Sequence, residues 1–203
     1  MGSELFLLLV ILLAIGSVGV GFVRNRNFRR KEALHQALAD AYHLQIAYAN
    51  ELNFTIFGQH REYPVQIDVA RLHVRGKREA RYCLKISLPM TNPNRKSLRI
   101  SRRNPDWSEF DGLAVIDRPF VVRHGISNWL EILTNDMIFS SLILSEDIKI
   151  TLFEVFNPLE AGLLCIHDEE LSFYYPGLLD SQEQHIHSGK ILELLCDIKD
   201  ELK

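Results

Sequence analysis

The sequence predicts an α+β protein: an N-terminal transmembrane helix, then one domain with a mainly antiparallel sheet packed by three helices. Three observations predict this fold class. They are a long apolar run near the N-terminus, several alternating segments joined by short turns, and amphipathic stripes with helical spacing. The chain has 203 residues, 47% apolar and 24% charged, so the part beyond the apolar run is long enough for one globular domain.

The first predicted element is an uninterrupted apolar run over residues 5–23. As a helix, its 19 residues span about 28 Å, close to the roughly 30 Å hydrocarbon core of a bilayer. We therefore expect a short extracytoplasmic N-terminus over residues 1–4 and a transmembrane helix over residues 5–23. The alternative is a cleaved signal peptide, but a signal peptide carries its positive charges before the apolar run, and here they follow it.

The charges that follow the apolar run predict its orientation. Because Lys and Arg beside a span are retained in the cytoplasm, we expect a single-pass protein of the cell (inner) membrane with its N-terminus outside. Residues 32–203 then form a single cytoplasmic α+β domain. The basic juxtamembrane segment, residues 24–31, contains Arg24, Arg26, Arg29, Arg30 and Lys31.

The first half of the domain predicts one helix and then several strands. Apolar residues at three- and four-residue steps predict a helix from Phe28 to Tyr42. Period-two alternation then predicts strands, with a hairpin turn over residues 59–62 and a bulge near Ala70, where the alternation changes parity. The expected strands cover residues 44–48, 54–58, 65–69, 82–88, 98–100 and 120–122.

The second half predicts two helices separated by three strands. Asn128 and Glu131 fit a capping box, which predicts a helix from about residue 128 to Met137. Alternation predicts the strands, two of which form a hairpin, and a strongly amphipathic stripe predicts the last helix. The strands cover residues 148–152, 163–166 and 171–175, and the last helix covers residues 191–202.

Charge is divided unevenly along the chain. Residues 1–103 carry 17 Lys or Arg and 7 Asp or Glu, whereas residues 104–203 carry 6 and 19. Three interpretations are open: a mixed solvated surface, a face that contacts anionic lipid head groups, or a nucleic acid site. The acidic second half would repel a polyanion, so a nucleic acid partner is not expected.

The basic residues are the candidate contacts for lipid or for a membrane protein partner, because each cation near an anionic leaflet contributes about 1 kcal/mol. In addition to the juxtamembrane cations they are Arg71, Arg75, Lys77, Arg78, Arg81, Lys85, Arg95, Lys96, Arg99, Arg102 and Arg103.

Metal and cofactor chemistry is not expected. His185 and His187, with Asp180 and Glu183 nearby, have the residue types of a metal site, but two histidines two positions apart diverge on a helix. A solvated helix start is the favoured interpretation. The sequence contains no HExxH, P-loop or GxGxxG pattern, and we expect no cofactor.

Catalytic residues are not expected either. The three cysteines, Cys83, Cys165 and Cys196, have no CxxC spacing, which argues against a disulfide framework or a zinc ribbon. Among the carboxylates, Asp111 is the first candidate for a functional role, although a role in a turn or a helix cap is favoured for it.

Several short motifs, together with the anchor, resemble bacterial single-pass membrane-anchored proteins of unknown function. The motifs are Phe54 to Gly58, Tyr63-Pro-Val65, the Phe110-Asp111 loop and the closing amphipathic helix. The resemblance implies no activity and no catalytic residue.

Together these features predict a membrane-anchored cytoplasmic interaction or scaffold domain. The alternative is a membrane-tethered enzyme or a small-ligand sensor whose site is assembled from residues scattered along the chain.

Overall fold

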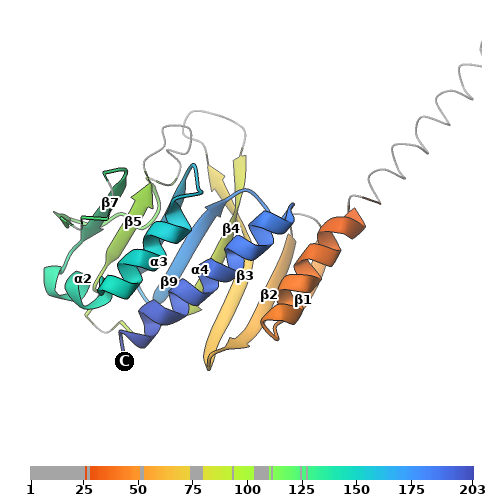
Figure 1. Ribbon diagram of the computed structural model, residues 1–203, viewed down its shortest axis with the longest axis horizontal. Coiled ribbons are helices and arrows are strands. Elements are labelled where there is room, and N and C mark those ends of the chain that lie inside the picture. The colour runs from red at the N-terminus through yellow and green to blue at the C-terminus, as the bar shows by residue number, and fades with distance from the viewer. Residues whose placement is uncertain are drawn as a thin grey trace, which may run out of the picture.

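The computed structural model of the protein is shown in Figure 1. An antiparallel sheet runs across the whole domain, and helices lie side by side over one of its faces. The residues that the structure describes are 26, 28–50, 53–73, 80–92, 94–102, 110, 112–123, 125–126 and 128–203.

Nine strands form the described sheet, and each strand runs antiparallel to its neighbours in the order β1-β2-β3-β4-β9-β8-β5-β7-β6. The C-terminal hairpin β8–β9 lies between β4 and β5, so segments far apart in the sequence meet at the centre. The strands are β1 (Gln45–Asn50), β2 (Asn53–His60), β3 (Tyr63–His73), β4 (Ala80–Pro89), β5 (Leu98–Arg102), β6 (Phe120–Val121), β7 (Leu130–Thr134), β8 (Gly162–His167) and β9 (Glu170–Pro176).

Helices cover one face of this sheet (Figure 1). The N-terminal helix, described over residues 28–41, lies over β1 and β2, and α4 crosses the central strands. Side-chain caps start the other three helices: Asp136, Ser145 and Ser181 each accept a hydrogen bond from the backbone N–H three residues on. These helices are α2 (Met137–Ile143), α3 (Glu146–Phe156) and α4 (Gln182–Asp200).

The main core lies between the helices and the sheet. From α4, Ile191, Leu195 and Ile198 are fully buried, as their spacing along one helical stripe requires. The strands contribute alternate residues to the same layer, including Ile86 and Phe173 at the centre. Removing this apolar surface from water stabilises the fold by about 25 cal/mol per Å².

A smaller cluster covers part of the opposite face of the sheet. Phe110 packs there with Leu72, Cys83, Leu163 and Cys165. This cluster explains the parity change in β3, which does not need the bulge expected near Ala70. The pairing of β3 with β4 is continuous from residue 66 to residue 73, and Leu72 is buried because the second face is covered at that point.

The expected fold class is wrong in two respects, and the first is the helical count. The sheet is antiparallel as expected, but four helices, not three, accompany the nine strands in the described chain. The segment expected to be a helix from residue 128 contains strand β7, and the segment expected to be a strand, residues 148–152, lies inside α3.

Side-chain burial gives the reason for both exchanges. Leu130, Ile132 and Thr134 are buried at steps of two, as in a strand. In α3, Ile148 and Leu152 are buried at a step of four, whereas Ile150 between them is 60% exposed.

The second respect concerns the membrane. Among the residues that the structure describes, no helix is both long enough and apolar enough to cross a bilayer. The segment expected to do so, residues 5–23, lies outside the described residues, as do residues 1–4. The fold that is described is therefore a helix-covered sheet, without the membrane helix that the expected fold class included.

A buried histidine fixes the N-terminal helix on the sheet. The His35 ring stacks on Phe54 with centroids 4.0 Å apart and lies 5.5 Å from Tyr48, and only 1% of the residue is exposed. Burial lowers the pKa of His35 to about 4, although the nearby Asp180 carboxylate acts in the opposite direction. The folded protein therefore holds this ring in its neutral form.

The His35 environment predicts that the protein loses stability in acid. The unfolded chain takes up a proton on this ring near pH 6.5, whereas the folded chain does so only near pH 4. The contribution is complete above pH 6.5 and is lost progressively as the pH falls, by up to roughly 3 kcal/mol. Urea unfolding from pH 7 to pH 4 should show a weaker pH dependence for His35→Phe than for the natural protein; equal dependence would contradict this account.

Candidate functional site: the two ends of the sheet

Eleven of the sixteen candidate basic residues lie in the described chain, and they do not form one group. Four are exposed at the end of the domain where the N-terminal helix begins: Arg26, Arg29 and Arg30 on the helix, and Arg71 on β3. We call these four residues the basic end. The other five candidates, which lie outside the described residues, are Arg24, Arg75, Lys77, Arg78 and Arg103.

The N-terminal helix begins at the end of the sheet where β3 ends (Figure 1), and strand pairing places Arg71 at that end of β3. The Phe28 ring packs edge-on against Tyr48 at 5.5 Å, and Tyr48 pairs with Phe54 near the start of β2. Because β3 is antiparallel to β2, the last residues of β3, including Arg71, lie beside the start of β2. In the sequence, Arg71 is some 40 positions from the cations of the helix, and the fold brings all four to one end of the sheet.

The basic end is open to solvent. None of its four residues has an ion pair with a residue in the described part of the chain. Lys31, the residue directly after Arg30, is instead paired with Asp180 at 3.0 Å, which ties the helix to the segment before α4. Arg81, opposite Leu72 on β4, is half-buried at this end.

The remaining candidate cations contact their own domain. Lys85 is paired with Glu170 at 2.5 Å and lies over the Tyr174 ring, while Lys96 is paired with Asp136 at 3.5 Å. Arg95, beside Lys96, is exposed near the opposite end of the sheet.

Two arginines of β5 serve the fold directly. Arg99 is 7% exposed and donates to the backbone carbonyls of Phe110 and Leu113, both at 3.2 Å. Arg102 donates to three carbonyls at the end of α3, including Leu159, and stacks on Trp129 at 4.6 Å. Both residues hold segments of the chain in place, although whether any candidate cation also contacts lipid stays a prediction.

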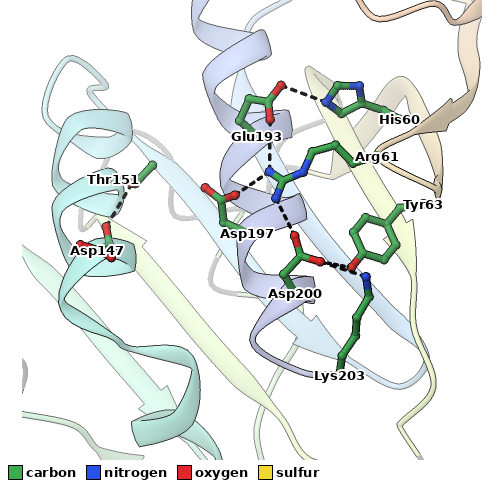
Figure 2. A network of polar contacts seen from close by, with 9 residues as sticks. All are labelled: His60, Arg61, Tyr63, Asp147, Thr151, Glu193, Asp197, Asp200 and Lys203. Carbon is green, nitrogen blue, oxygen red and sulfur yellow. Dashed lines mark hydrogen bonds and ion pairs between the residues drawn. The ribbon is translucent and has the colours of Figure 1, made fainter.

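At the opposite end, a polar clamp joins α4 to the β2–β3 turn (Figure 2). The Arg61 guanidinium reaches three carboxylates of α4: Asp200 at 2.5 Å, Asp197 at 2.6 Å and Glu193 at 3.3 Å. His60 contacts the other oxygen of Glu193 at 2.9 Å. The Arg61 side chain, in the short loop between β2 and β3, therefore contacts two successive helical turns of α4.

Tyr63 completes the clamp. Its hydroxyl donates to Asp200, and two cations contact its ring, with Lys199 Nζ 4.8 Å and Lys203 Nζ 4.6 Å from the centroid. The hydrogen bond from Tyr63 and the Lys203 ammonium lower the pKa of the Asp200 carboxyl. The hydrogen bond with Asp197 raises the pKa of Arg61.

The sequence contained a signal for the clamp that we missed. Glu193, Asp197 and Asp200 follow one another at helical steps of four and three, so they share one side of α4. A carboxylate stripe of this kind needs a cation opposite it, and only the fold shows that Arg61 is that cation.

The candidate metal ligands do not come together. No group of three or more His, Cys, Asp or Glu residues in the described chain is arranged to hold a metal ion. His187 is half-buried, 5.5 Å from the Tyr175 ring, and burial lowers its pKa. With Tyr175, Glu183 and Lys190 it lines an open hollow of about 500 Å³ beside the start of α4, where the alternative of a small-ligand site is best tested.

The cysteine thiols are buried and weakly acidic. Burial raises the pKa of Cys83 to about 12 and of Cys165 and Cys196 to about 11. A thiol in this range is protonated at neutral pH and is a poor nucleophile. Asp111 lies outside the described residues.

Comparison with known proteins shows a likeness of fold alone. No protein-family model matches the chain, and no curated protein matches it in sequence. The crystal structure of the mycobacterial trehalose monomycolate transport factor A is similar, with a TM-score of 0.53 and 11% sequence identity. The alignment covers 86% of this chain and 93% of that one, so the likeness extends over most of both chains.

The clamp predicts opposite effects for substitutions of two neighbouring turn residues. Arg61 and Glu62 both have left-handed backbones, with φ of 50° and 70°. Arg61→Ala keeps that strained backbone and loses three exposed ion pairs, so it should lower the free energy of unfolding by about 1 kcal/mol or more. Glu62→Gly relieves strain without touching the clamp and should raise it by roughly 0.5–1 kcal/mol. Chemical denaturation measures both, and a loss of stability in both variants would contradict this account.

Proposed function

We propose that this protein is a membrane-associated accessory domain whose basic end rests on anionic lipid head groups. The observation that carries the proposal is the basic end of the sheet. There, Arg26, Arg29, Arg30 and Arg71 are exposed at the end of the domain where the N-terminal helix begins. The chain enters the domain at this edge. A membrane attached to the preceding residues would therefore lie next to these four cations.

The apolar segment over residues 5–23 supports attachment at that edge. We propose that this segment holds the chain to the cell membrane, with the N-terminus outside and the domain in the cytoplasm, because five cations follow it within residues 24–31. The domain is then tethered only a few residues from the lipid surface, at a high effective concentration.

The structural likeness is consistent with an accessory role. The similar protein is named as a transport factor for trehalose monomycolate, and we take from that name only the idea of an accessory to a transport process. We accordingly propose a membrane protein as a partner, with the domain acting as a scaffold or regulator beside it.

Vesicle binding tests the lipid contact. All described core residues come from positions 38–198, so a chain of residues 26–203 keeps both clusters, and its fold can be checked by circular dichroism. It should cosediment with phosphatidylglycerol vesicles, more weakly at high salt, and not with phosphatidylcholine vesicles. Arg29→Glu with Arg71→Glu should weaken binding by about 30-fold or more, since each cation contributes about 1 kcal/mol.

The matched control reverses two cations elsewhere. Arg95 and Arg118 are both exposed at the end of the sheet opposite the basic end. Arg95→Glu with Arg118→Glu changes the net charge by the same amount and should leave vesicle binding nearly unchanged. Equal loss in the two double variants, or binding to neutral vesicles with the same affinity, would contradict the proposed orientation.

A further inference from the structure

The exposed side of α3 carries apolar residues that the core does not use. Ile148, Leu152 and Val155 face the sheet and are buried, whereas Ile150 is 60% exposed and Phe153 is 42% exposed. The exposed pair lies three residues apart and therefore on one stripe of the helix surface.

This apolar stripe continues toward the edge of the sheet. The Phe153 ring lies 6.1 Å from Trp129, which precedes β7. Trp129 in turn lines a hollow of about 380 Å³ together with Val121 and Val122 beside the edge strand β6. Val121 is 67% exposed, so exposed apolar residues reach from α3 to the edge strand β6, with Asn128 and Glu131 lining the same hollow.

Unpaired carboxylates border the stripe. On α3, Glu146 is already paired with Lys149 at 2.5 Å. Asp147 and Glu154 are exposed and have no ion pair with any described residue. They are seven positions apart, so they lie on the same side of the helix, about 10 Å from each other.

From this arrangement we propose that α3 and Trp129 dock an amphipathic α-helix of a partner protein. Its apolar side lies on Ile150 and Phe153, and its flanking Lys or Arg residues pair with Asp147 and Glu154. An amphipathic helix is recognised by an apolar surface that buries its apolar side and by charged residues that pair with its flanking charges. The exposed side of α3 has an apolar surface and charged residues beside it.

Two other occupants fit the surface less well. An anionic lipid surface would be repelled by the unpaired Asp147 and Glu154. A second copy would have to offer a basic amphipathic helix, and the basic helix of the described chain has already buried its apolar side, including Leu38, against its own sheet. The proposal does not depend on the lipid contact of the basic end.

Photo-crosslinking of the full chain in the cells that produce it tests the proposal. With p-benzoylphenylalanine replacing Ile150, we expect a crosslinked protein whose attachment site maps to an amphipathic helix with Lys or Arg seven positions apart. The same probe replacing Phe57, which is 41% exposed on the opposite face of the sheet, should not capture that protein.

Charge variants decide whether the carboxylates recognise the helix. Asp147→Asn with Glu154→Gln should lower the crosslinking yield roughly fivefold, the effect of losing two exposed ion pairs. The matched control, Asp117→Asn with Glu169→Gln at other exposed positions, should leave the yield unchanged. In the crosslinking experiment, the proposal is overturned by the absence of any crosslink at position 150, or by crosslinks to lipid, to a second copy or to a segment without basic flanks. In the comparison of the two charge variants, it is overturned by equal crosslinking yields.

Discussion

The contact on which the rest of the structure depends is the packing of α4 across the centre of the sheet. Ile191, Leu195 and Ile198 fill the layer above β4 and β9, two strands that are distant in the sequence. The helix also packs closely against Tyr42, which directly follows the N-terminal helix: a Cβ added at Gly189 would lie 3.1 Å from Tyr42 Cζ, so any larger residue would require the tyrosine ring to shift. One helix thus joins both halves of the chain.

The two ends of the sheet differ in what their charged side chains contact. At one end the clamp around Arg61 ties the helix to the β2–β3 turn, and the charged side chains of the clamp pair with one another. At the other end the N-terminal helix begins, and Arg29, Arg30 and Arg71 have no described acidic partner. These exposed cations lie where the chain enters the domain and are free to meet an external anion, and this placement is the basis of the proposed orientation on a membrane.

Local patterns predicted the strands well and the middle of the chain poorly. The alternation of β4 and the turn between β2 and β3 could be predicted because each depends on neighbours in sequence. The first helix was expected to end at Tyr42, and His43 after it has the left-handed φ of 55° typical of a residue that follows a helix. Residues 128–152 were exchanged between helix and strand because short apolar runs there fit both periods. The true helix signals were the caps Asp136 and Ser145, which sequence reasoning passed over.

The candidate site could be predicted only in part, for a related reason. Composition showed an excess of cations in the first half of the chain, but not which of them the fold would use. Arg99 and Arg102 bind backbone carbonyls, and Lys85 on β4 is paired with Glu170 on the neighbouring strand β9. Hydrogen–deuterium exchange of the full chain in lipid nanodiscs tests the central claim most directly. Anionic lipid, compared with neutral lipid, should protect residues 28–31 and 71–73 and leave the turn at residues 60–63 unchanged, whereas protection at that turn, or none at the basic end, would contradict the account.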